Sequence, residues 1–97
     1  MTSKTIKRIA CQVNKIPVGC IYHPNLVQAL YARLLTCHRL HEMGLEAYDT
    51  GKLLGIESHV VKKLLDAYST RINQDEFFKA INEIFYERIE KYGKECE

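Results

Sequence analysis

Two pairs of cysteine and histidine are the residues of this chain best suited to bind a metal. Cys20 precedes His23 by three positions, and Cys37 precedes His41 by four. Thiolates and imidazoles are the preferred ligands of structural zinc, and positions i and i+4 of a helix point the same way. The order Cys-His-Cys-His is unusual for a zinc finger, however, and Cys37 also fits the apolar stripe of a helix. Zinc binding stays an open alternative, and we predict no metal site and no cofactor.

Cys20 and His23 also have the residue types of a nucleophile and its base. Such a pair needs a third group to orient the base and a turn to stabilise an oxyanion, and the sequence marks neither nearby. The sequence also lacks a phosphate-binding loop of the GxxxxGK(S/T) type. We therefore do not expect an enzyme.

Charge is distributed unevenly along the chain, although the formal net charge is only +2. Residues 1–41 contain six lysines and arginines and no acid, whereas residues 42–97 contain all twelve acids and eight bases. A basic end favours binding to nucleic acid or to an acidic partner, unless the two halves attract each other within one domain. The candidate nucleic-acid-binding residues are Lys4, Lys7, Arg8, Lys15, Lys52, Ser58, His59, Lys62 and Lys63.

Residues 47–67 have the glycine and apolar spacing of a helix-turn-helix unit, with helices expected at about 46–54 and 58–68. Gly55 can adopt the positive φ of a sharp turn, and Gly51 leaves room for a close approach between the two helices. The apolar positions that close the angle between the helices are Leu54, Ile56, Val61 and Leu64.

The second helix of this unit carries mixed signals for DNA recognition. Ser58, His59, Lys62 and Lys63 are its polar positions and suit contacts to phosphates or base edges. Glu57, however, places a negative charge at the start of the helix, and the helix offers no arginine, asparagine or glutamine at those positions for bidentate base reading. A helix-turn-helix DNA-binding regulator, dimeric because one such helix reads few bases, is therefore the alternative reading.

Helical periodicity extends over most of the remaining chain. Residues 3–15 predict a basic amphipathic helix with Ile6 and Ile9 in its apolar stripe, within a segment 1–16, and residues 17–23 predict a linker. We expect a long helix from Pro24 to Gly44, and a last helix that starts at residues 73–76 and stops at Gly93. Residues 24–93 then form the helical core.

The fold expected from these elements is an all-α orthogonal bundle of about five helices in a single domain, residues 1–97. Its predicted core comes from the apolar stripes of four of the helices. The predicted core residues are Leu30, Leu34, Leu54, Ile56, Val61, Leu64, Leu65, Phe77, Ile81, Ile84 and Phe85.

Residues 30–93 resemble the C-terminal collar domain of the bacterial clamp-loader delta subunit. The resemblance rests on the Arg33-Leu34-Leu35 helix followed by Gly44, on residues 51–56 (GKLLGI) and residues 60–65 (VVKKLL), on the helix start at Asp75-Glu76, and on residues 90–93 (EKYG). That family carries two further domains ahead of the collar, one of them ATPase-like, and this sequence has no counterpart to either. The resemblance implies a stand-alone domain that holds subunits together by helix packing.

The expected function is that of a small non-enzymatic adaptor of DNA metabolism, which contacts a protein partner in a replication-type assembly. Its short length suits a phage or mobile element. No apolar run approaches the ~18 residues of a membrane span, and no signal peptide is recognisable, so we expect a cytoplasmic protein. Its cysteines, Cys11, Cys20, Cys37 and Cys96, are then expected to be reduced thiols.

Overall fold

Five α-helices and one short 3-10 helix make up the regular structure of the described chain, which contains no strand. The computed structural model describes the backbone of residues 1–96 and the side chains of residues 1–93. The elements are α1 (Ser3–Val13), the 3-10 helix η1 (Val18–Cys20), α2 (Val27–Glu42), α3 (Ala47–Leu54), α4 (Ser58–Gln74) and α5 (Glu76–Cys96). The prediction of an all-α bundle is confirmed.

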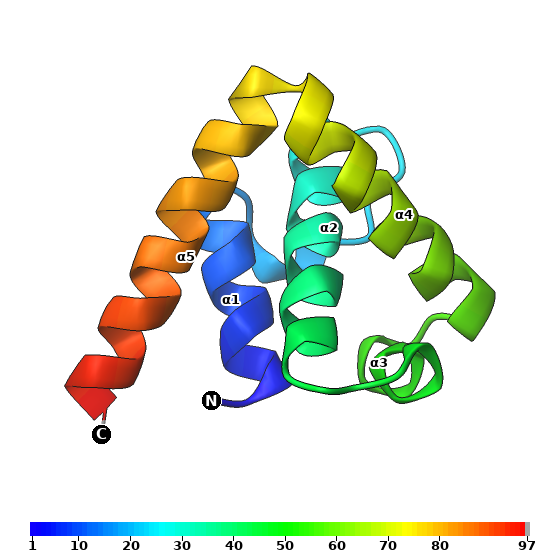
Figure 1. Cartoon of the computed structure of the whole chain (residues 1–97), viewed down its shortest axis with the longest axis horizontal. Coiled ribbons are helices and arrows are strands. Elements are labelled where there is room, and N and C mark those ends of the chain that lie inside the picture. The colour runs from blue at the N-terminus through cyan, green and yellow to red at the C-terminus, as the bar shows by residue number, and fades with distance from the viewer. Residues whose placement is uncertain (97) are drawn as a thin grey trace.

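Helix α2 lies at the centre of the molecule and packs against each of the other four α-helices. In Figure 1, α4 and α5 diverge from a common apex like an inverted V, and α1 lies between α5 and α2. Leu34, Leu35, Cys37 and Leu40 of α2 are almost completely buried. Apolar residues cover several sides of α2 because several of its sides face neighbouring helices.

Helix α1 buries its predicted apolar stripe but ends earlier than expected. Ile6 and Ile9 lie in the core, and the helix stops at Val13. Lys15 follows in the left-handed region with φ 59°, and the N–H of Ile16 donates to the carbonyl of Cys11 at 3.1 Å. This is the hydrogen bond of a Schellman motif, formed here with lysine at the position that glycine usually occupies.

The linker after α1 is fixed by two side chains that bond to backbone carbonyls. Arg33 of α2 donates from Nη1 to the carbonyl of Ile21 at 2.6 Å. The Tyr22 hydroxyl donates to the carbonyl of Leu54 at 2.5 Å, at the end of α3. These bonds attach residues 17–23 to the core on one side and to the helix-turn-helix unit on the other.

The turn between α3 and α4 depends on two glycines. Gly55 has φ 72°, and the N–H of Ile56 donates to the carbonyl of Gly51 at 3.0 Å. A Cβ atom placed on Gly51 would lie 2.5 Å from the carbonyl oxygen of Ile56. The close approach predicted at Gly51 is confirmed, with the backbone of the turn as the neighbour of this glycine.

Several predicted helix boundaries are wrong. The second helix starts at Val27, because Pro24 and Asn25 form a preceding turn. Helix α4 continues to Gln74, well beyond residue 68, and only Asp75 separates it from α5. Helix α5 runs through Gly93 to Cys96, and this glycine keeps helical backbone. The stop at Gly44 is confirmed, where φ is 94° directly after the α2 cap. The predicted bounds of α3 and the predicted starts of α1, α4 and α5 are confirmed as well.

The predicted core face of α5 is also wrong in part. Phe77 is 64% exposed and Ile84 is 41% exposed, whereas Phe78 is completely buried. The ring of Phe78 packs against Tyr31 of α2, with 4.9 Å between the ring centroids. The other predicted core residues are buried or pack partly buried against the core; they are Leu30, Leu34, Leu54, Ile56, Val61, Leu64, Leu65, Ile81 and Phe85.

Replacing Gly51 with alanine tests the close approach in the turn. We expect Gly51→Ala to lower the free energy of unfolding by about 1–3 kcal/mol, because the clash with Ile56 outweighs the ~1 kcal/mol that alanine gains in a helix. Urea denaturation measures the change. Gly19→Ala is the control, because a Cβ there meets no atom within 4 Å. Equal stability of the two variants would contradict the close approach.

Candidate interaction surfaces

The exposed face of the helix-turn-helix unit carries most of the residues predicted to meet nucleic acid. Lys52, Lys62 and Lys63 are exposed, as is His59, while Ser58 is half-buried. The Nζ of Lys52 lies 5.0 Å from the ring centroid of Tyr48 one turn earlier, so a cation–π contact holds this lysine along α3.

Acidic side chains divide this basic face. The Nδ1 of His59 lies 3.1 Å from a carboxylate oxygen of Glu57. Asp66 is exposed one turn beyond Lys62 on α4. A phosphate backbone would therefore meet carboxylates beside the lysines, and this reduces the electrostatic attraction that non-specific DNA binding requires.

The structure does not bring the predicted basic residues together. Lys4, Lys7, Arg8 and Lys15 belong to the segment of α1, which packs against α2, α5 and η1. Lys52, Lys62 and Lys63 belong to α3 and α4, which pack against each other and against α2. Figure 1 shows α1 and α4 on opposite sides of α2. The two groups consequently form separate surfaces.

The cysteine and histidine pairs lie in different environments. Cys37 is completely buried, and burial raises the pKa of its thiol to about 12. His41 is exposed, and His23 accepts a hydrogen bond at Nδ1 from the N–H of Asn25. Among the described residues, no three histidine, cysteine or acidic side chains are placed to hold a metal ion. Cys11, Cys20 and Cys37 are free thiols, and the side chain of Cys96 lies outside the described residues.

A polar network at the apex of the inverted V joins α2, α4 and α5. Asp75 accepts hydrogen bonds at Oδ2 from the Tyr31 hydroxyl at 2.5 Å and from Arg71 at 3.3 Å, and at Oδ1 from the N–H of Phe78 at 3.0 Å. The hydrogen bond from Tyr31, followed by that from Phe78, holds the pKa of Asp75 below its ordinary value. Burial and the same bond raise the pKa of Tyr31.

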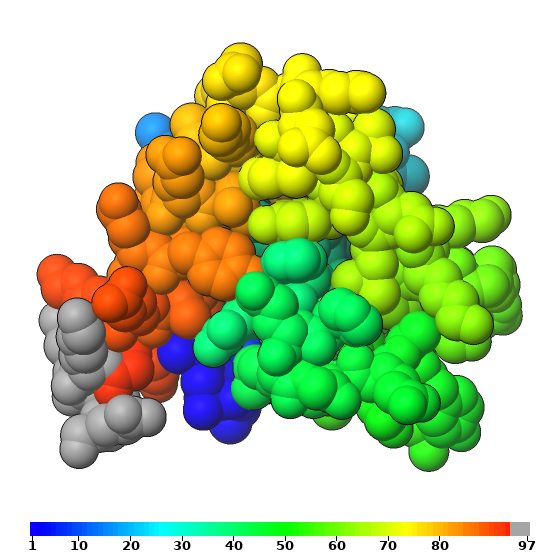
Figure 2. All heavy atoms as spheres, in the orientation of Figure 1, coloured from blue at the N-terminus to red at the C-terminus, as the bar shows by residue number. Residues whose placement is uncertain are grey.

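A second aromatic and polar cluster joins α2 to both α4 and α5. The ring of His38 stacks on Tyr68 with 3.6 Å between centroids and 9° between planes. The Tyr86 hydroxyl donates to Glu42. Burial lowers the pKa of His38, against the raising effect of Glu42. In Figure 2, side chains of α2, α4 and α5 meet on this face of the molecule.

Sequence reasoning missed this cluster. The only local signal was the spacing of His38 and Glu42, one helical turn apart on α2, with 3.8 Å between Nε2 and a carboxylate oxygen. Tyr68 and Tyr86 join the cluster through tertiary packing, which a periodic pattern does not specify. Stacking and hydrogen bonding engage these groups, so the cluster serves to fasten α4 and α5 to α2.

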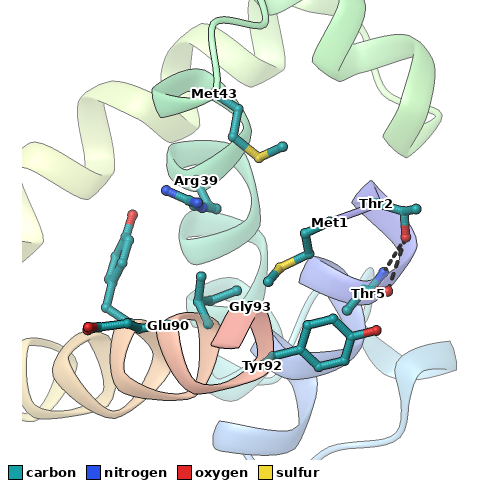
Figure 3. A pocket seen from close by; sticks show the side chains of 10 residues that line it. Met1, Thr2, Thr5, Arg39, Met43, Glu90, Tyr92 and Gly93 are labelled. Carbon is teal, nitrogen blue, oxygen red and sulfur yellow. Dashed lines mark hydrogen bonds between the residues drawn. The ribbon is translucent and has the colours of Figure 1, made fainter. Parts of the chain in front are cut away.

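An open pocket lies between the start of α1 and the last turns of α2 and α5 (Figure 3). Its walls include Met1, Met43 and Tyr92, together with the charged Arg39 and Glu90. The Nε of Arg39 is buried and has no hydrogen-bond partner in the described structure. The lining mixes one cation and one carboxylate with apolar groups, and so favours no single ligand chemistry.

Helix α5 carries exposed apolar side chains next to its buried face. Phe77 and Ile84 are large and exposed, and Ala80 between them is exposed as well. At 100° per residue the three lie within an arc of about 60° on the helix surface. We call this group the α5 outer stripe. Sequence reasoning placed Phe77 and Ile84 of this stripe in the core, and the structure leaves both exposed to solvent.

Comparisons with known proteins leave the family of the chain open. No family model, no curated protein and no solved structure matches it. No helix in the described residues has the length and apolar character needed to cross a membrane.

Replacing Asp75 with asparagine tests the network at the apex by its pH dependence. A carboxylate whose pKa falls on folding stabilises the protein above its unfolded pKa of about 3.9, and this stabilisation is lost as the pH falls through the lower folded pKa. Asparagine keeps the capping acceptor and removes the charge. We expect Asp75→Asn to be less stable than wild type at pH 7, with a difference that shrinks below about pH 4.

Urea denaturation at several pH values measures this difference. Asp66→Asn, on the exposed side of α4, is the control. A stability loss in Asp75→Asn that is independent of pH would show that the charge of Asp75 is unimportant.

Proposed function

We propose that this chain is a small non-enzymatic adaptor of DNA metabolism that binds a protein partner through its helices. The α5 outer stripe is the observation that carries the proposal. Exposed apolar side chains that follow one side of a helix are typical of surfaces that bury against another protein. Phe77, at 64% exposure, is of the residue class that anchors such interfaces.

The resemblance to the clamp-loader collar domain supports the same proposal. The motif residues shared with that family include Gly51, Leu54, Val61 and Leu64, all of which are buried here. Buried motifs specify how helices pack, and collar domains use packed helices to join subunits. A replication-type assembly in the cytoplasm is the setting that this resemblance favours.

A second candidate function is a helix-turn-helix DNA-binding regulator, acting as a dimer. The exposed start of α4, with Lys62 and Lys63, favours it. Two observations weigh against it: Glu57 and Asp66 interrupt the basic face, and the basic residues of α1 lie on the other side of α2. The separated charges support the adaptor over the regulator.

A salt titration against duplex DNA of mixed sequence separates these functions. For an adaptor we expect weak binding at about 0.15 M salt, and no further loss in the double variant Lys62→Glu, Lys63→Glu. These lysines are exposed, so the variant keeps its fold, which circular dichroism checks.

The matched control is Lys4→Glu, Arg8→Glu on α1, which reverses two exposed charges of the other basic group. Tight binding at moderate salt that either double variant abolishes would overturn the adaptor function in favour of nucleic-acid binding. The variant responsible would also identify the surface used.

A further inference from the structure

We propose that the α5 outer stripe binds a basic amphipathic helix of a partner protein. This inference rests on the adaptor function proposed above and adds the chemical class of the partner. The stripe consists of Phe77, Ala80 and Ile84, three positions that span about two turns of α5.

The stripe is shaped to receive an apolar ridge. Ala80 separates the larger Phe77 and Ile84, and its small side chain lets a second helix approach closely. The ring of Phe77 contacts the ring of Tyr31, with 6.1 Å between the centroids and an interplanar angle of 35°. The hydroxyl of Tyr31 is in turn bonded to Asp75. A ring that already packs against a neighbour loses less side-chain entropy on binding than one without such a contact.

Acidic residues border the stripe on one side. Glu76, Glu83 and Glu87 are exposed, and the helical period places them within about 40° of one another, directly beside the stripe. We call them the glutamate row. An apolar helix with lysine or arginine along the facing edge would satisfy both the stripe and the row.

The opposite border of the stripe has a different charge. Arg88 lies there, next to Ile9 and Gln12 across the groove between α1 and α5. Basic residues of the partner are therefore favoured on the side of the glutamate row, whose charge is offset in part by the exposed Lys79 and Lys91, one turn from Glu83 and Glu87. This asymmetry sets the orientation in which the partner helix lies on α5.

Two other occupants fit less well. A second copy of α5 would bring its own glutamate row against the first, which is repulsive. Helix α1 of a second copy is basic, but its apolar side chains Ile6, Ile9 and Val13 are at most 6% exposed and are engaged in its own core. Duplex DNA is disfavoured because its phosphates would face the same carboxylates.

Two synthetic peptides test the proposal. Each is a helix of about 15 residues with a leucine stripe. The first has lysine along one edge, and the second has glutamate at the same positions. Fluorescence anisotropy at about 0.15 M salt, where exposed charges are partly screened, measures binding to the whole chain. We expect the lysine peptide to bind and the glutamate peptide to bind at least about tenfold more weakly.

Variants of the chain locate the binding surface. We expect Phe77→Ser, Ile84→Ser to weaken binding of the lysine peptide at least about tenfold. We expect Glu83→Lys, Glu87→Lys to reverse the preference between the two peptides. Tyr48→Ser is the matched control, because Tyr48 is an equally exposed aromatic residue on α3 at 63% exposure, and it keeps wild-type binding.

Equal binding of both peptides, or equal effects of Phe77→Ser, Ile84→Ser and Tyr48→Ser, would overturn the inference. Its failure is distinguishable from failure of the adaptor function. Weak binding to DNA without peptide binding leaves an adaptor that uses another surface. Tight binding to DNA that the charge-reversed variants lose removes the adaptor function itself.

Discussion

One residue, Asp75, connects the two longest helices, and the arrangement of the bundle depends on how it is held. Its extended backbone interrupts what is otherwise a continuous helical segment from Ser58 to Cys96. Its carboxylate bonds to α4 through Arg71, to α5 through the N–H of Phe78 and to α2 through Tyr31. A joint of one residue leaves little freedom in the angle between two helices. These three bonds therefore fix where α4 and α5 pass on either side of α2.

The position of α2 explains the distribution of charge on the surface. Because α4 packs on one side of α2 and α1 packs on the other, between α2 and α5, α2 separates the basic residues of the first helix from those of the helix-turn-helix unit. The stack of His38 on Tyr68 and the bond from Tyr86 to Glu42 attach α4 and α5 to α2 a second time, beyond the bonds of Asp75. These contacts hold α4 against α2, away from the basic residues of α1.

Local chemistry explains which features the sequence predicts. Gly51 leaves room for the backbone of Ile56, and Gly55 has a positive φ, and glycine meets both requirements at low cost. The helix-turn-helix unit was therefore predictable from these two glycines and four apolar positions. The amphipathic pattern of α1 was equally clear, but its end was not, since Lys15 takes the left-handed position without the glycine that usually marks it. The interruption at Asp75 was visible as a helix start, whereas the length of α4 before it depended on tertiary packing.

The choice between Phe77 and Phe78 shows how the apex determines the interaction surface. Two adjacent phenylalanines differ by 100° around a helix, and the periodicity of the later residues is compatible with either as the core position. Asp75 caps α5 through the N–H of Phe78, and Tyr31 packs its ring on that same residue. This contact sets the rotation of α5 about its axis. Once Phe78 faces the core, Phe77 and Ile84 must face outward beside the glutamates. The exposed stripe on α5 therefore follows from the contacts of Asp75 and Tyr31 with Phe78, which orient the start of this helix.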